Sequence, residues 1–272
     1  MIVATVLHRA FSLAAVLVST TALTTSTPTH SHDIRGATDS RAANARAQEE
    51  NTPYNGQFIF ARLRYNDGLR GIGGFRRGRG NDPGWYHDYP AAEYNLMQIF
   101  TAITTLEPGS ETGNIVHIGD PELHKYPIAY MSEPGFWTMN DEELANMRSY
   151  LLKGGFLIFD DFPREAWENF SIQMQRLLPE IQPVALDPTQ EIFHSFFDID
   201  AFEELYFSYR GRPLFVGYFE DNDPTRRLLA IANYMNDLGE NWEFATRGFE
   251  VVDATNQAFK FGVNYILYGM TH

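Results

Sequence analysis

The sequence predicts a doubly wound α/β domain built on a mostly parallel sheet. Short apolar runs alternate with helical patterns between residues 55 and 272, and turn or capping residues separate them. The central run, residues 156–159, is continuously apolar, which is typical of a strand buried on both faces of a parallel sheet. Asp160 and Asp161 follow it directly.

The other elements are predicted from the spacing of apolar residues. Strands are predicted at residues 58–65, 115–118, 127–131 and 213–219. Helical spacing occurs at residues 96–106, 144–151, 167–177 and 258–269. Residues 183–186 and 192–197 have a mixed strand and loop pattern, and residues 228–234 fit either a helix or a strand.

Capping residues place the central strand between two helices. Asn140 and Glu143 form a capping-box pattern, and Gly154 suits the left-handed position that ends a helix. Pro163 suits the first turn of the next helix, where its missing N–H costs nothing. Asp160 and Asp161 are therefore expected at the carboxyl edge of the sheet, where open α/β sheets bind ligands.

Composition excludes several classes of function. The 272-residue chain is 44% hydrophobic, enough for one sizeable core. It has no cysteine, which excludes disulfides, thiolate nucleophiles and cysteine-ligated metals. The formal net charge of −14 argues against nucleic acid and anionic membranes as partners. The oligomeric state is not predicted.

The N-terminal region is typical of an exported protein. His8 and Arg9 precede an apolar run at residues 10–18, which is too short to span a bilayer but fits a signal peptide. We expect residues 1–30 to be the signal peptide, residues 31–54 a disordered linker and residues 55–272 a single domain. The expected location is periplasmic or secreted, with no stable membrane span after cleavage. A disordered cytoplasmic extension is the alternative.

A set of motifs resembles a bacterial family of uncharacterised proteins, domain of unknown function 4159. The motifs are residues 60–65, Trp85 with 88–90, 126–131, 154–162, 192–194, 236–239 with Trp242, and 262–264. The resemblance covers about residues 56–272 and implies a flavodoxin-like fold of the class I glutamine amidotransferase-like type. It also implies that residues 228–234 form a strand. Enzymes of that type use a cysteine at the strand-to-helix turn, so this chain is not a glutamine amidotransferase.

Polar residues at the predicted strand ends are the candidates for ligand binding. Hard cations take carboxylate oxygens, and imidazole suits zinc or manganese, so a divalent metal site is conceivable, although the spacing matches no closed metal motif. The candidates are Arg62, Arg64, Trp85, His87, Asp88, Asp120, Asp160, Asp161, His194, Asn236 and Asp237.

Most of these residues also have a structural interpretation. Asp161 is the candidate cap of the following helix, which leaves Asp160 as the residue of the site. His194 fits a hydrogen-bonded core histidine. Trp85, with Tyr86 and Tyr89, fits either packing or sugar stacking. Arg62 and Arg64 share one face of the first strand, and each needs an acidic partner if buried, which the aspartates at the strand ends could supply. Residues 68–84 are rich in glycine and arginine, and they fit either a surface loop or a loop that binds phosphate through its backbone N–H groups.

Three hypotheses about function remain open. The first is an exported domain that binds a small or carbohydrate-like ligand at the carboxyl edge of its sheet. The second is a hydrolase that uses the acidic residues at the strand ends, with or without a divalent metal. The third is a structural or interaction module without a ligand.

Overall fold

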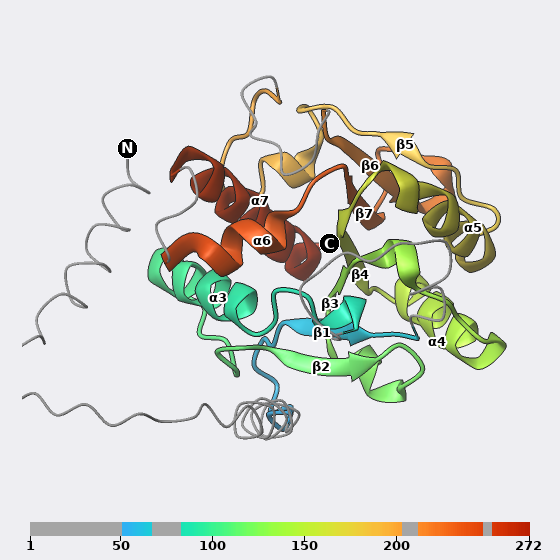
Figure 1. Cartoon of the computed structure of the whole chain (residues 1–272), viewed down its shortest axis with the longest axis horizontal. Coiled ribbons are helices and arrows are strands. Elements are labelled where there is room, and N and C mark those ends of the chain that lie inside the picture. Colours follow the sequence, from blue (N-terminus) through green and yellow to red (C-terminus); the bar gives the residue numbers. More distant parts are fainter. Residues whose placement is uncertain (1–50, 67–82, 203–211, 247–251) are drawn as a thin grey trace, which may run out of the picture. The chain divides into compact units, whose positions relative to one another are not determined.

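A seven-stranded sheet forms the centre of this computed structural model (Figure 1). The structure describes residues 51–66, 83–202, 212–246 and 252–272. The predicted signal peptide, nearly all of the predicted linker and most of the glycine-rich loop lie outside these residues. Residues Thr52–His272 form one compact unit. None of the helices in the described ranges has the length and apolarity that crossing a membrane requires.

The strand order confirms the predicted doubly wound fold. The strands lie in the order β2-β1-β3-β4-β7-β6-β5. The first five are parallel, and β6 and β5 each pair antiparallel with a neighbour. The order of the five parallel strands is that of a flavodoxin-like sheet, with the chain reversing direction across the sheet between β1 and β3. Ligands of such folds bind beside that reversal, at the carboxyl ends of the strands.

The elements have the following bounds. The strands and α-helices are β1 (Ala61–Arg64), α3 (Ala91–Ile103), β2 (Asn114–His117), β3 (Ile128–Ser132), α4 (Asp141–Leu152), β4 (Phe156–Phe162), α5 (Trp167–Leu177), β5 (Val184–Ala185), β6 (Leu214–Phe219), β7 (Leu228–Tyr234), α6 (Leu238–Glu243) and α7 (Val252–Thr271). Short 3-10 helices lie at Gly84–Tyr86, Pro121–Lys125, Pro134–Phe136, Arg164–Ala166, Glu191–Phe193, Glu220–Asn222 and Phe244–Thr246.

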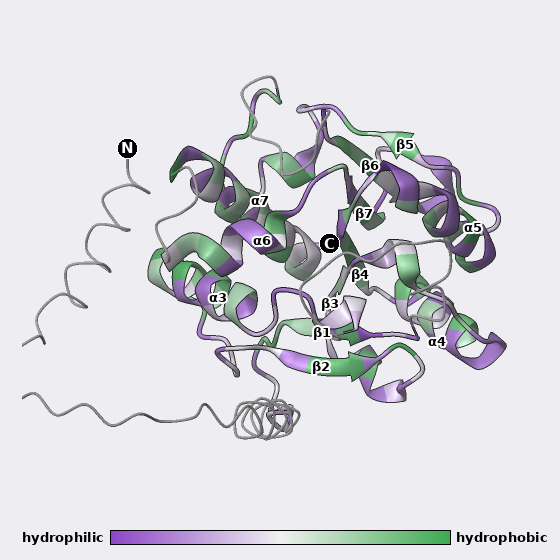
Figure 2. Ribbon diagram, in the orientation of Figure 1, coloured by the Kyte–Doolittle hydropathy of each residue, from purple (hydrophilic) through white to green (hydrophobic). Residues whose placement is uncertain are grey.

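Helices cover both faces of the sheet, and β4 contributes to both cores. Leu157 and Phe159 pack with the residues of α4 and α5, whereas Phe156 and Ile158 pack with those of α3 and α7. All seven residues of β4 are buried. Figure 2 shows the same layering, with green strands inside and purple residues on the outer faces of α4 and α5. This explains why residues 156–159 of β4 are continuously apolar rather than alternating.

Several predicted elements differ from those observed. The first strand is shorter than predicted, and residues 192–197 begin with a 3-10 turn rather than a strand. Pro163 is the N-cap of a 3-10 helix, and α5 begins only at Trp167. Residues 228–234 are the strand that the family resemblance implied. Helix α6 was not predicted, because six residues are too few for a periodic pattern.

Candidate functional site

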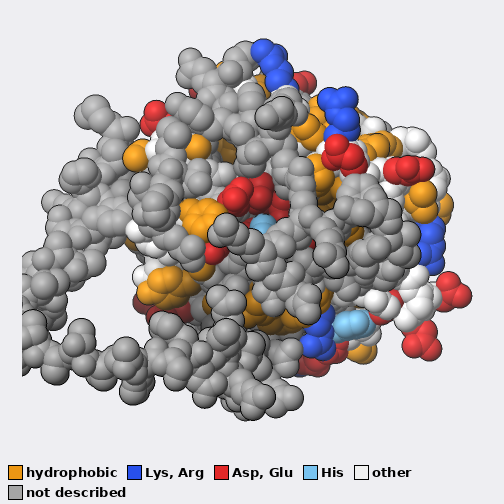
Figure 3. All heavy atoms as spheres, in the orientation of Figure 1, with side chains coloured by type: hydrophobic (Ala, Val, Ile, Leu, Met, Phe, Trp, Pro, Cys, Tyr) orange, Lys and Arg blue, Asp and Glu red, His pale blue; other side chains and the backbone are white. Residues whose placement is uncertain are grey.

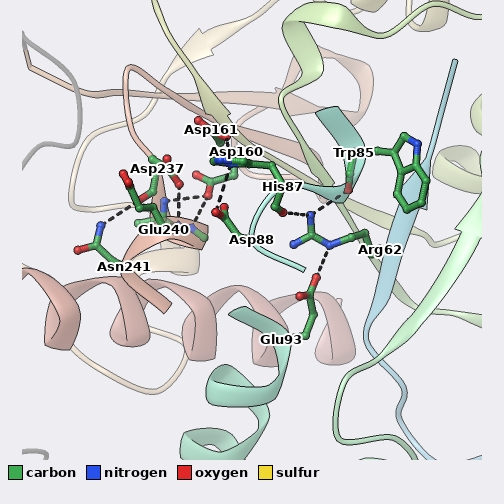
Figure 4. A network of polar contacts seen from close by, with 12 residues as sticks. Arg62, Trp85, His87, Asp88, Glu93, Asp160, Asp161, Asp237, Glu240 and Asn241 are labelled. Carbon is green, nitrogen blue, oxygen red and sulfur yellow. Dashed lines mark hydrogen bonds and ion pairs between the residues drawn. The ribbon is translucent and has the colours of Figure 1, made fainter. Parts of the chain in front are cut away.

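Four side chains converge at the carboxyl edge of the sheet. His87, Asp88, Asp161 and Asp237 each offer one ligand atom, and these atoms all lie within 4.8 Å of one another. We call these four residues the acidic cluster. They come from the loop after β1, the end of β4 and the start of α6. Figure 3 shows Asp and Glu side chains gathered beside a histidine near the centre of this face, and Figure 4 shows the residues pointing toward one another.

The loop that carries His87 and Asp88 is held by a buried arginine. Arg62 is 1% exposed, and its Nη1 donates to the carbonyl oxygens of Trp85 at 3.0 Å and of His87 at 2.7 Å. Its Nε forms an ion pair with Glu93 of α3. Two peptide groups of the loop are thereby fixed to β1. Asp88 has a φ of 65°, a left-handed conformation that asparagine and aspartate adopt more readily than most residues.

Asp160 and Asp161 point to different places because the end of β4 is irregular. Asp161 has a φ of 56°, and the pairing of β4 with β7 shifts register between Phe159 and Phe162. A bulge of this kind redirects a side chain and often lies beside a functional site. Oδ2 of Asp161 lies 2.9 Å from Nδ1 of His87.

Asp160 is a structural residue. It has no exposed surface and accepts hydrogen bonds from Tyr130 Oη at 2.9 Å and Asn233 Nδ2 at 3.1 Å. The backbone N–H groups of Leu238 and Gly239 donate to the same carboxylate at 2.8 Å and 2.9 Å. Asp160 therefore fixes the N-terminus of α6. The predicted roles were reversed: no side chain caps the helical segments after Pro163, and Asp161 belongs to the acidic cluster.

The carboxylate of Asp88 is the least satisfied group of the acidic cluster. Its side chain is fully buried, and neither oxygen accepts a hydrogen bond from the described residues. Nδ1 of His87 lies 3.2 Å from Oδ1. A Cβ at position 239 would meet Oδ2 at 2.7 Å, so Gly239 permits the close approach of α6 to this carboxylate.

Burial and mutual repulsion shift the pKa values of these groups. Burial raises the pKa of Asp88 to about 6, and burial together with the charges of Asp161 and Asp88 raises the pKa of Asp237 well above its usual value. The hydrogen bond to Asp161, followed by the ion-pair contact with Asp88, raises the pKa of His87 to about 11. The imidazolium is thus the only cation of the acidic cluster. A divalent cation would neutralise the three carboxylates more completely.

Comparison with known proteins identifies the family. The family model described as domain of unknown function 4159 matches residues 59–270. The chain belongs to this family. No curated protein matched the chain.

The structure brings together only some of the residues that were predicted from the sequence as candidates for ligand binding. Asn236 lies next to the acidic cluster, and its Oδ1 accepts a hydrogen bond from the N–H of Asp237. Trp85 is buried and packs in the hydrophobic core. Asp120 instead caps a 3-10 helix. His194 is partly exposed rather than a core histidine, and it contacts Asp198 and the carbonyl of Pro188.

The arginine prediction was correct for one residue and its proposed partner was wrong. Arg62 is buried, but it pairs with Glu93 rather than with the aspartates, and Arg64 is exposed. Glu93 was missed because one acidic residue near the start of a helix is ordinarily a surface residue. The signal that could have found it was the need of a buried Arg62 for an acidic partner.

Proposed function

We propose that this domain binds a divalent cation through the acidic cluster and uses it to hold a small, oxygen-rich ligand at the carboxyl edge of the sheet. The observation that carries the proposal is the carboxylate of Asp88, which is buried, accepts no hydrogen bond from the described residues and faces three further ligand atoms. Leaving a carboxylate buried in this way is costly unless a cation compensates it.

The donor set favours a transition metal. One imidazole nitrogen and three carboxylate oxygens suit Mn²⁺, Fe²⁺ or Zn²⁺ better than Ca²⁺, which prefers six to eight oxygen ligands. The side chain of His87 is 43% exposed, so one side of the acidic cluster is open to solvent. On a six-coordinate ion, four protein donors would leave positions for water or for oxygens of a ligand, such as the hydroxyl groups of a sugar.

That open side also supports a second candidate function, metal-dependent hydrolysis. A cation lowers the pKa of a bound water and makes it a nucleophile at neutral pH. The test is the metal-loaded protein assayed against ester, phosphoester and glycoside substrates, beside Asp161→Asn as the inactive control. Hydrolysis by the wild type alone would favour the enzyme over the binding module.

Metal titration of the full chain tests the proposed function directly. After chelator treatment and dialysis, Mn²⁺, Zn²⁺, Mg²⁺ and Ca²⁺ are titrated by calorimetry into the wild type, Asp88→Asn and Asp120→Asn. We expect a single site, with affinity at least tenfold weaker in Asp88→Asn, which corresponds to about 1.4 kcal/mol. Asp120→Asn removes a carboxylate outside the acidic cluster and should bind as the wild type does. Equal binding by all three proteins, or none, would contradict the proposal.

A further inference from the structure

A cavity lies at the amino ends of the parallel strands, at the edge of the sheet opposite the acidic cluster. It has a volume of about 650 Å³ and opens beside the segments that lead into β3 and β4. We call it the lysine cavity. It is lined by Tyr54, His124, Lys125, Tyr126, Pro127, Tyr150, Lys153, Gly154 and Gly155. Its volume lies within the range of sites for small molecules.

The lysine cavity is unusual in its charge. The whole chain has only three lysines, Lys125, Lys153 and Lys260, and two of them line this cavity. Lys125 pairs with Glu122, one turn earlier in the same 3-10 helix. Lys153 follows the last turn of α4, is exposed, and makes no ion pair with any residue in the described ranges. In a chain with a net charge of −14, this concentration of ammonium groups favours an anion.

The polar groups that remain available in the lysine cavity are mostly hydrogen-bond donors. An ammonium group has three donors and no acceptor. Oη of Tyr126 accepts from Asn114 at 2.9 Å, which leaves its own hydrogen available, and Oη of Tyr150 already donates to the carbonyl of Phe156 at 3.2 Å. A ligand for this cavity must therefore supply acceptors, as phosphate, carboxylate and sugar oxygens do.

The end of α4 does not oppose an anion in the lysine cavity. Carbonyl groups at a helix C-terminus carry partial negative charge and would repel an anion. Here Arg227 donates to the carbonyl of Leu151 at 2.6 Å and to that of Gly155 at 3.1 Å. The N–H of Gly155 also donates to the carbonyl of Tyr150 at 2.9 Å. These bonds satisfy the helix end and add a positive charge nearby.

Four aromatic rings also line the lysine cavity. Tyr54 is 41% exposed and meets Tyr126 edge-on, with ring centroids 6.0 Å apart. His124 meets Tyr150 edge-on at 6.1 Å. We propose that the lysine cavity binds a small sugar that carries a phosphate or a carboxylate, with the anion on Lys153 and Lys125 and the ring against Tyr54. This site is separate from the acidic cluster and does not rest on the proposed metal.

Calorimetry with four probes tests this assignment on the full chain. The probes are glucose 6-phosphate, glucuronate, glucose and inorganic phosphate. We expect at least one charged sugar to bind at least tenfold more tightly than glucose or phosphate. A preference for glucose 6-phosphate or for glucuronate then identifies the anion. Lys153→Met should weaken binding about tenfold, since it removes a charge-assisted hydrogen bond.

Matched variants separate binding in the lysine cavity from general charge effects. Lys260→Met removes the third lysine, whose Nζ lies over Phe197 on another part of the molecule, and should leave binding unchanged. Tyr54→Ala should weaken binding several-fold, whereas Tyr94→Ala removes a comparably exposed tyrosine from α3 and should not. The assignment is wrong if no charged sugar binds, if glucose or phosphate binds equally well, or if Lys260→Met matches Lys153→Met.

Discussion

Oδ2 of Asp161 lies 2.9 Å from Nδ1 of His87, while the adjacent Asp160 accepts two backbone N–H groups from the start of α6. Two neighbouring carboxylates thus have different tasks. One belongs to the acidic cluster and the other holds the helix that carries Asp237. Asp160 thus positions one part of the site, and the next residue in the sequence, Asp161, is a candidate metal ligand.

The two aspartates should respond differently to substitution. Asp160→Asn replaces a carboxylate that accepts four hydrogen bonds, so we expect it to lower the free energy of unfolding by about 2–4 kcal/mol. Asp161→Asn removes one of three crowded carboxylates, and the metal-free variant should stay within about 1 kcal/mol of wild type. Denaturant unfolding after chelation measures both, with Asp120→Asn as the control. Equal losses in both variants would show that Asp161 is also structural.

The buried ion pair between Arg62 and Glu93 should couple stability to the geometry of the acidic cluster. Breaking such a pair leaves an uncompensated charge, so Arg62→Met and Glu93→Gln should each cost about 3–5 kcal/mol. The double variant Arg62→Met/Glu93→Gln should lose less than the sum of the single losses. Chemical denaturation of the three variants gives the coupling energy.

Arg64→Met supplies the control for that experiment. Arg64 lies two residues further along β1 but is exposed, so its substitution should change stability by about 0.5 kcal/mol or less. Additive losses in the double variant would mean that the Arg62–Glu93 contact contributes little. If the variants fold, Arg62→Met should also weaken metal binding, because the loop carrying His87 loses its anchor.

The fold could be predicted from the sequence because each sequence signal that indicated it was local. Apolar runs, the Asn140 capping box and the glycine after α4 act within a few residues, and all three have the predicted structure. Residues 228–234 were ambiguous, since their leucines and alanines favour helix until a neighbouring sheet buries them. The prediction of that strand therefore depended on the family resemblance.

The location of the candidate site could be predicted from the sequence, but the orientation and the partners of its side chains could not. Polar residues after successive strands indicated the carboxyl edge, and four of them meet there. Which aspartate faces the acidic cluster depends on the left-handed φ of Asp161, a consequence of tertiary pairing that no local signal encodes. The partner of Arg62 depends on how α3 packs against β1, for the same reason.

Export of the protein stays a prediction. It rests on the basic start, the short apolar run at residues 10–18 and the polar stretch behind it. We expect the mature protein to lack about the first 30 residues and to be recovered outside the cytoplasm. Fractionation of cells followed by N-terminal sequencing provides the measurement. Full-length protein that keeps Met1 in the cytosol would refute it.

Stability of the metal-free protein should depend on pH through the acidic cluster. Burial raises the pKa of Asp88 from 3.8 to about 6, so the folded state binds a proton more tightly than the unfolded state does. This contribution is fully present below about pH 4 and is lost as pH rises through 6. The free energy of unfolding should fall by about 1–3 kcal/mol across that window relative to Asp88→Asn.

A bound cation should reverse that dependence. The metal binds deprotonated carboxylates and neutral imidazole, so protons compete with it and affinity rises with pH. With saturating Mn²⁺, the wild type should therefore gain stability between about pH 5 and pH 7 relative to Asp88→Asn, whereas the chelated wild type loses it. Unfolding curves at each pH, with and without metal, give both slopes. If the two slopes have the same sign, protons and metal do not compete for the acidic cluster, and the proposed metal site is wrong.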